Sequence, residues 1–166
     1  PEDIPEEFAD EAKKEGCGAL AGLLYRTSLE KETKKHGKGQ KAPAQRLSDF
    51  LDGKESKDLP ESSYTPGVVS SRLDVWLPPY IKNRLAQGFK DFNKNMHGFI
   101  CPDALLIASE TRTSTPVRIL RDKDSLECVA LKNLYPAGEG SGYSGGIVSS
   151  AMDGENACGA IAKKIK

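Results

Sequence analysis

NLYPAGEGSGYSGGI, residues 133–147, is the stretch that decides the fold of this chain. It places five glycines within nine residues, 138–146. The apolar run from Leu131 to Tyr135 predicts a short strand before the glycines. The segment from Ile147 to Ile165 predicts a helix after them, with Ala151, Ala157, Ala160 and Ile161 on its packing side. A strand, a glycine loop and a helix in this order indicate an α/β fold.

The glycine loop is suited to the close approach of a ligand. Glycine lets the backbone come near another group and adopt positive φ. The start of the following helix carries unpaired N–H groups and the positive end of the helix dipole, which favour an electron-rich or anionic group. A flexible glycine turn without a ligand is one alternative. A phosphate-binding loop is a weaker one, since no Lys or Arg interrupts residues 138–146 and the nearest preceding lysine is Lys132.

Two further strands are expected upstream of the loop. The continuous apolar run Ala104–Ala108 predicts a strand that is buried on both faces. The alternating run Val117–Leu120 predicts a second strand, which ends in a turn at Asp122–Asp124. These two predicted strands also favour an α/β fold for the C-terminal region.

The first hundred residues predict three helices. Apolar positions spaced by three or four residues indicate each of them, and glycines end the first two. The first carries a stripe from Leu20 to Lys31 and stops near Gly37, the second runs over residues 42–51, and the third runs through residues 81–92. Residues 54–72 are rich in Pro, Gly and Ser, which predicts a connector.

Composition excludes several classes of partner. The 166 residues are 37% hydrophobic and 29% charged, with a mean hydropathy of −0.51, so the core is expected to be thin for the length. Lys plus Arg and Asp plus Glu number 24 each, so no net charge draws the chain to nucleic acid or anionic lipid. No apolar run approaches the ~20 residues of a membrane span. The four cysteines form no CxxC, so no metal site is expected.

Five blocks of sequence carry a resemblance to a known family. They lie at residues 41–51, 77–80, 102–106, 110–119 and 134–154. In this order they resemble the uncharacterised FAD-dependent dehydrogenases of the NAD(P)/FAD-dependent oxidoreductase group, over roughly residues 20–166. That group is related to the aminoacetone-oxidase-like flavoproteins and, more distantly, to the glutathione reductase superfamily.

The resemblance implies FAD as cofactor and assigns roles within the glycine loop. Gly138-Glu139 matches the position at which this superfamily places an acid on a ribityl hydroxyl of FAD. Gly142, Gly145, Gly146 and Ile147 would lie at the flavin's pyrimidine edge, toward which the last three would direct backbone N–H groups, with Tyr143 and Ser144 beside the ring. Arg112 is expected to contact an anion or the flavin edge, the alternative being a structural ion pair with Glu110 or Asp103.

The resemblance also implies a division of the chain. Residues 1–100 would be the end of an inserted, mostly helical substrate domain. Residues 101–166 would be the returning C-terminal portion of a Rossmann-like FAD-binding fold. The family's first phosphate loop is absent from the sequence, so the expected partner is the upstream half of the same flavoprotein or a partner chain.

Two functions are compatible with these features. The first is flavin-dependent transfer of hydride or electrons to an unidentified substrate, with catalytic residues unassigned. The second is a non-catalytic structural or interaction subunit that no longer binds FAD. The resemblance leaves the compartment open between cytoplasm and plastid.

Overall fold

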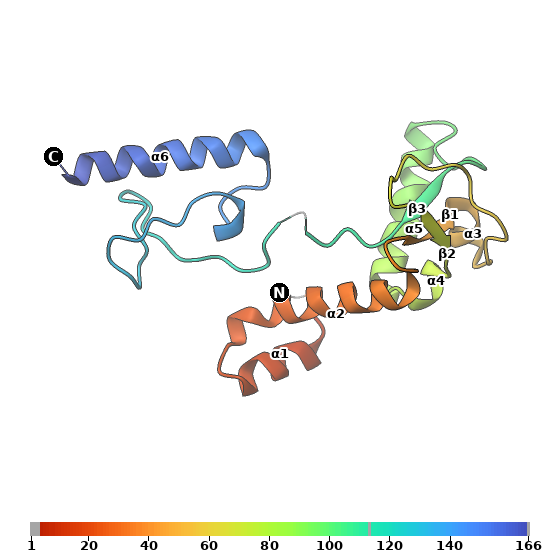
Figure 1. Cartoon of the computed structure of the whole chain (residues 1–166), viewed down its shortest axis with the longest axis horizontal. Coiled ribbons are helices and arrows are strands. Elements are labelled where there is room, and N and C mark those ends of the chain that lie inside the picture. The colour runs from red at the N-terminus through yellow and green to blue at the C-terminus, as the bar shows by residue number, and fades with distance from the viewer. Residues whose placement is uncertain (1–3, 113, 166) are drawn as a thin grey trace. The chain divides into compact units, whose positions relative to one another are not determined.

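The computed structural model describes residues 4–112 and 114–165, which form two compact units (Figure 1). Unit 1 combines Pro1–Ser28 with Glu110–Lys166, and unit 2 is Leu29–Ser109. Unit 2 is therefore nested within unit 1 along the sequence.

The N-terminal part of unit 1 is a pair of helices joined by a tight turn. Helix α1 (Glu6–Lys14) and the 3₁₀ helix η1 (Gly18–Leu20) lead into α2 (Ala21–His36), which continues into unit 2. Ala12 is fully buried at this turn. A Cβ at Gly22 would meet the Pro116 side chain at 2.9 Å, so glycine lets the chain on either side of unit 2 come close together.

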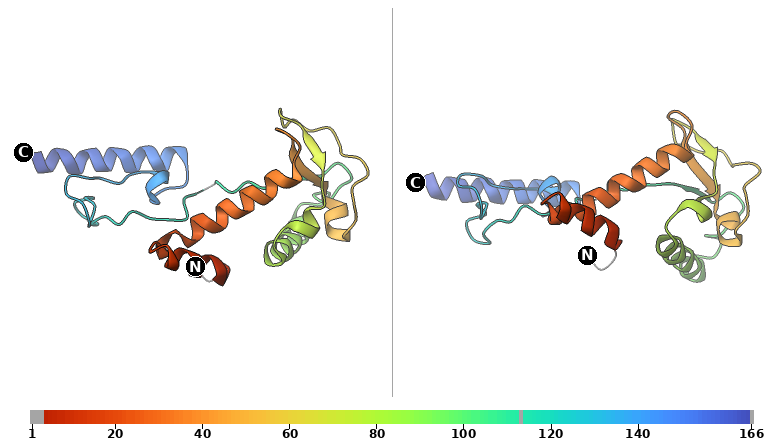
Figure 2. Two further views of the ribbon diagram at one scale, coloured as in Figure 1. Left: turned by 60° about the horizontal axis from the view of Figure 1, so that its bottom comes forward. Right: turned by 90° about the horizontal axis from the view of Figure 1, so that it is seen from below.

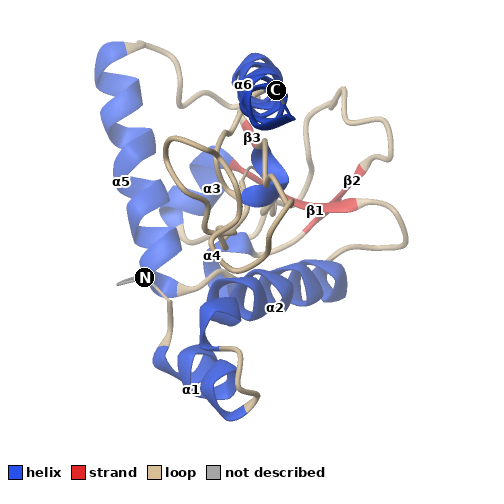
Figure 3. Cartoon of the chain, turned by 90° about the vertical axis from the view of Figure 1, so that its left-hand side faces the viewer, coloured by secondary structure: helices blue, strands red, loops and turns tan. Residues whose placement is uncertain are grey.

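The C-terminal part of unit 1 is a long loop that ends in one helix. Among its described residues, the loop contains the short 3₁₀ helix η2 (Glu139–Ser141) and no other helix or strand, and α6 (Ile147–Ile165) follows it (Figure 3). Lys164 near the end of α6 binds both carboxylate oxygens of Glu127 at 2.8 Å. Side-chain contacts to α6, rather than a sheet, therefore hold the loop.

Unit 2 is built on a three-stranded mixed sheet in the order β2-β1-β3. Its strands are labelled in Figure 1, and Figure 2 shows the ribbon from two other directions. Central strand β1 (Ala42–Arg46) pairs parallel with β2 (Val68–Ser70) and antiparallel with β3 (Leu105–Ile107). The helices of this unit are α3 (Leu47–Asp52), α4 (Leu73–Trp76) and α5 (Pro79–Asn95). Their apolar faces form the core around Phe50, Leu73 and Leu77.

A buried polar network crosses unit 2 beside this core. The Gln45 amide donates to Asp74 Oδ1 at 2.7 Å and to the Lys54 carbonyl at 2.8 Å, while its oxygen accepts from the Asp74 backbone N–H at 3.1 Å. Arg72 binds both oxygens of Asp74 at 2.7 Å. Since Gln45 is fully buried, its partners offset the cost of removing an amide from water.

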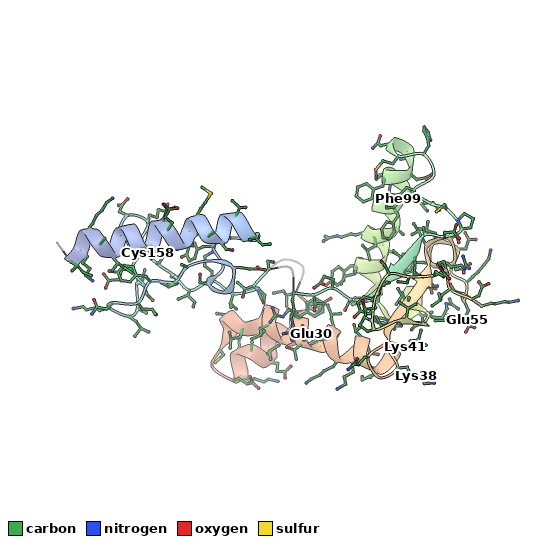
Figure 4. All side chains as sticks on the ribbon, turned by 45° about the horizontal axis from the view of Figure 1, so that its top comes forward. Glu30, Lys38, Lys41, Glu55, Phe99 and Cys158 are labelled. Atoms are coloured by element: carbon green, nitrogen blue, oxygen red, sulfur yellow. The ribbon has the colours of Figure 1, made fainter. Side chains whose placement is uncertain are left out.

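The two ends of unit 2 lie side by side. Thr33 on α2 and Ser109, which closes the unit, share a hydrogen bond between their hydroxyl oxygens at 2.6 Å. The turn between α2 and β1 carries Lys38 and Lys41, which form an isolated antiparallel bridge (Figure 4). A Cβ at Gly37 would come within 2.7 Å of the Lys41 carbonyl, so the helix ends at this glycine.

The α/β class expected from the sequence is confirmed, since the structure combines helices with a small mixed sheet. Helices α2, α5 and α6 lie where the spacing of apolar residues places them, and α2 ends at His36 beside Gly37. The left-handed Gly53 ends α3, as the Asp52-Gly53 pair predicts. The predicted division at residue 100 stays a prediction.

The strand predicted at Ala104–Ala108 is confirmed as β3, but three other expectations about residues 42–108 are wrong. Residues 42–46 form β1 rather than the first turn of a helix, because sheet partners on both sides take up their backbone groups. The apolar run around Leu106 is an edge strand, not one buried on both faces, and Ile107 is 39% exposed. Residues 54–72, expected to be a connector, contain β2.

The predicted strands at Val117–Leu120 and Leu131–Tyr135 are absent from the described residues. A strand needs a neighbouring strand, and here single backbone bonds fold the segment back on itself instead. The backbone N–H of Val129 donates to the Leu120 carbonyl at 3.0 Å, and the backbone N–H of Cys128 donates to the Leu134 carbonyl at 2.7 Å. The positive φ of Asn133, 62°, also interrupts an extended chain.

Candidate functional site

In the glycine loop of unit 1, the short helix η2 is flanked by two glycines with positive φ, Gly138 and Gly142. Gly138 has φ 75° and ψ −166°, a region open almost only to glycine. Gly142 has φ 86°, and a Cβ there would lie 2.7 Å from the Val117 carbonyl oxygen. These two glycines are thus required by the conformation of the chain itself.

At the other three positions of the loop, the conformation of the chain does not require glycine. Gly140, Gly145 and Gly146 have negative φ, and a Cβ at Gly140 or Gly145 would meet nothing within 4 Å. At Gly146 it would meet only the Ser149 hydroxyl, at 3.5 Å. The backbone at these positions is therefore open to a group from outside the chain.

Glu139 is the acid of the loop and the first residue of η2. It is half-buried, and no hydrogen bond or ion pair joins its carboxylate to another described residue. A carboxylate in this state can accept hydrogen bonds from hydroxyl groups. Its position is fixed by the backbone, since Gly142 N–H donates to the Glu139 carbonyl at 2.9 Å.

The start of α6 follows the loop directly. Ser149 caps it, because its hydroxyl accepts from Gly146 N–H at 3.1 Å and donates to the Gly146 carbonyl at 3.0 Å. Ser144 and Ser150 share a hydrogen bond of 2.9 Å, which joins the loop to the second turn of the helix. Ile147 is 92% exposed and Val148 is 72% exposed, so the helix presents apolar side chains beside its first N–H groups.

An ion pair beneath the loop joins it to α6. Arg121 binds Asp153 through two bonds, from Nη1 to Oδ2 at 3.0 Å and from Nη2 to Oδ1 at 2.6 Å. Asp153 also accepts from Gly138 N–H at 2.9 Å, and Arg121 donates to the Pro136 carbonyl at 2.7 Å. The hydrogen bonds from Arg121 and then from Gly138 hold the pKa of Asp153 below its ordinary value.

Tyr143 at the far end of the loop contacts the same arginine. Arg121 lies 3.7 Å from the Tyr143 ring centroid, and its backbone N–H donates to the tyrosine hydroxyl at 3.1 Å. Arg118 lies 5.0 Å from the same centroid and donates to the Gly142 carbonyl at 2.8 Å. Cation–π contacts and hydrogen bonds therefore fix the tyrosine within its own unit.

The structure places eight of the nine residues expected to bind the cofactor on one continuous segment. They are Gly138, Glu139, Gly142, Tyr143, Ser144, Gly145, Gly146 and Ile147. The ninth, Arg112, is exposed on the chain leading out of β3, where its N–H donates to the Glu110 carboxylate at 3.1 Å.

Sequence reasoning missed Arg121 and Asp153. They lie 32 positions apart, and neither belongs to a local motif. The only local signal is an acid within the small-residue stretch of α6.

The cysteines and acids suggest no second chemical site among the described residues. The cysteines are unpaired, with Cys128 buried and Cys158 exposed on α6 (Figure 4). Within residues 4–112 and 114–165, no three His, Cys, Asp or Glu side chains gather as metal ligands would. No helix of that part of the chain combines the length and apolar character of a membrane span.

Comparison with known proteins identifies relatives of this chain. Residues 6–113 match a family model described as FAD-dependent protein, C-terminal domain-like. An uncharacterized protein of Clostridium beijerinckii is 40% identical over 153 residues, which cover 90% of this chain. The chain spans 27% of the length of that relative. The glycine loop lies beyond the segment matched by the family model.

Proposed function

This chain belongs to the FAD-dependent protein, C-terminal domain-like family, and we propose that it supplies the flavin side of an FAD site in an oxidoreductase. The observation that carries the proposal is the half-buried Glu139, whose carboxylate has no partner among the described residues. A carboxylate that no protein group occupies can accept hydrogen bonds from the hydroxyl groups of a ligand. The ribityl chain of FAD offers hydroxyl groups for that purpose.

The rest of the loop fits the flavin end of the cofactor. Gly145 and Gly146 leave room for a flat ring against the backbone, and the helix start beyond them favours the electron-rich pyrimidine edge. Ile147, Ser144 and Tyr143 lie along the same segment. Arg112 is assigned to an anion or the flavin edge. When bound, FAD supplies hydride or electron transfer, and the protein supplies position and electrostatics.

The proposal includes a partner, the remainder of a full-length family member. Unit 1 exposes apolar side chains along its loop and helix: Leu120, Val129, Leu131, Ile147, Val148 and Met152. Such a surface is costly in water and is typical of an interface. Since the relative is several times longer than this chain, its remaining length can cover this surface and hold the FAD pyrophosphate.

Two finer assignments belong to the same proposal. Residues 1–100 would descend from an inserted substrate domain, and residues 101–166 would return to the FAD-binding domain. The whole would be related to the glutathione reductase and aminoacetone-oxidase-like flavoproteins.

The second candidate is a subunit that keeps this fold for interaction and binds no FAD. The exposed apolar surface of unit 1 favours it as well, since an interface alone explains that surface. It gives no reason for the open glycines or the unpartnered Glu139. FAD binding therefore separates the two candidates.

The experiment is a chimera of the Clostridium beijerinckii relative in which this chain replaces the matched segment. We expect the purified chimera to be yellow and to show flavin absorption bands in a visible spectrum. The unaltered relative serves as the control for folding. If the relative binds FAD and a well-folded chimera is colourless, the interaction subunit becomes the better account.

Glu139→Ala in the chimera tests the assignment of the acid. Loss of a charge-assisted hydrogen bond is expected to weaken FAD binding by about 10- to 100-fold, measured by fluorescence titration of the apoprotein. Glu155→Ala is the matched control, because Glu155 is an exposed acid on α6 in the same unit. Equal FAD affinity in both variants would contradict the role of Glu139.

A further inference from the structure

We propose that Asp153 and Arg121 are positioning residues that hold the glycine loop in the conformation that receives the flavin. This inference rests on the function proposed above. It adds two residues that lie outside the loop and act through it. Neither needs to touch the cofactor.

The pair fixes the beginning of the loop through its backbone. Gly138 takes a conformation that is open almost only to glycine, and Asp153 Oδ2 accepts its N–H at 2.9 Å. Arg121 holds the carbonyl of Pro136, two residues earlier, at 2.7 Å. Glu139 follows Gly138 directly, so the direction of its carboxylate depends on these two bonds.

The same arginine fixes the end of the loop. Its guanidinium lies 3.7 Å from the centroid of Tyr143, and its backbone N–H binds the tyrosine hydroxyl at 3.1 Å. The Arg121 side chain therefore contacts both Pro136, before the loop, and Tyr143, within it. Because Asp153 lies on α6, its bond to Gly138 also fixes the position of the loop relative to the start of that helix.

Burial makes this arrangement rigid. The side chains of Arg121 and Asp153 are only 9% and 14% exposed. Loss of one partner of a largely buried ion pair leaves an uncompensated charge, so the two side chains stay together in the folded protein. The pair is thus suited to select one loop conformation.

The test uses the chimera that binds FAD, with Asp153→Asn as the main variant. Asparagine keeps an oxygen for Gly138 N–H but removes the charge that orients Arg121. We expect FAD affinity to fall about 10- to 100-fold. We also expect the midpoint potential of the bound flavin to fall, since a displaced helix start stabilises the reduced flavin less.

Lys164→Gln is the control for a purely structural effect. Lys164 also ties α6 to the loop of unit 1, through Glu127 and Asn133, but at the other end of the helix. This variant is expected to lower the thermal midpoint and leave FAD affinity and flavin potential unchanged. Asp153→Glu, which keeps the charge, is expected to restore part of the affinity lost in Asp153→Asn.

The outcomes separate this inference from the proposed function. If the unaltered chimera takes up no FAD, the proposed function fails and the inference falls with it. If it takes up FAD and Asp153→Asn matches it in affinity and potential, only the inference is overturned. If Lys164→Gln shifts the potential as much as Asp153→Asn does, the effect is general loosening and the inference is also overturned.

Discussion

At the scale of single residues, the glycines of the loop divide into two kinds. Gly142 is required by the fold, since an added Cβ would meet Val117 and the residue has positive φ. Gly145 has open space around it and negative φ. Substitution by alanine should therefore lower the stability of the protein at Gly142, and at Gly145 it should affect ligand binding instead.

Gly142→Ala is expected to destabilise the protein by about 1–3 kcal/mol through strain and crowding. Gly145→Ala is expected to change stability by less than about 0.5 kcal/mol, yet to weaken FAD binding in the chimera. Urea denaturation and FAD titration measure the two effects. Equal stability of the two variants would show that the crowding at Gly142 relaxes without cost.

The residues of the candidate site could be predicted only where they are neighbours in sequence. The loop from Gly138 to Ile147 is continuous, so its glycines and its acid are visible together. The contact of Arg121 with Asp153 depends on how the loop turns back against α6, which no local pattern records. The capping of Gly146 by Ser149 depends likewise on side-chain geometry.

At the scale of elements, the long helices could be predicted, whereas only one of the three strands, β3, was expected. Helices such as α6 satisfy their own backbone hydrogen bonds, so the periodicity of their apolar residues is sufficient. A strand depends on its neighbour, and β1 exists because Val68–Ser70 and Leu105–Ile107 flank it. Leu131–Tyr135 has strand-like composition but no such neighbour among the described residues.

The polar network at β1 gives a prediction for unit 2. Asp74→Ala removes one of the hydrogen bonds of buried Gln45 and leaves Arg72 without its counterion. We expect a loss of about 2–4 kcal/mol in the free energy of unfolding. Asp91→Ala is the control, because Asp91 forms an exposed pair with Lys94 on α5 and should cost less than about 0.5 kcal/mol. Thermal unfolding followed by circular dichroism compares the two.

At the scale of the whole molecule, both units depend on a carboxylate with a lowered pKa. Hydrogen bonds from Arg72 and Gln45 lower the pKa of Asp74 in unit 2, although burial acts in the opposite direction. Arg121 and Gly138 lower that of Asp153 in unit 1. A lowered pKa in the folded state contributes stability that is present above the ordinary aspartate value and lost as pH falls through the folded value.

Stability is therefore expected to fall between about pH 5 and pH 2 in both units. The thermal midpoint measured across this range checks the expectation. Asp74→Asn should flatten the part of the curve that belongs to unit 2, and Asp153→Asn the part that belongs to unit 1. A pH dependence unchanged in both variants would assign acid sensitivity to other carboxylates.

The hydrogen bond between Thr33 and Ser109 has a consequence for how such a chain arises. It shows that unit 2 begins and ends at one place. A segment whose termini lie close together can be inserted into a surface loop of a host protein without separating the two ends of that loop, as domain insertion requires. The segment Leu29–Ser109 could therefore be moved to another host protein. It could also be deleted, with a short linker connecting the two parts of unit 1 in its place.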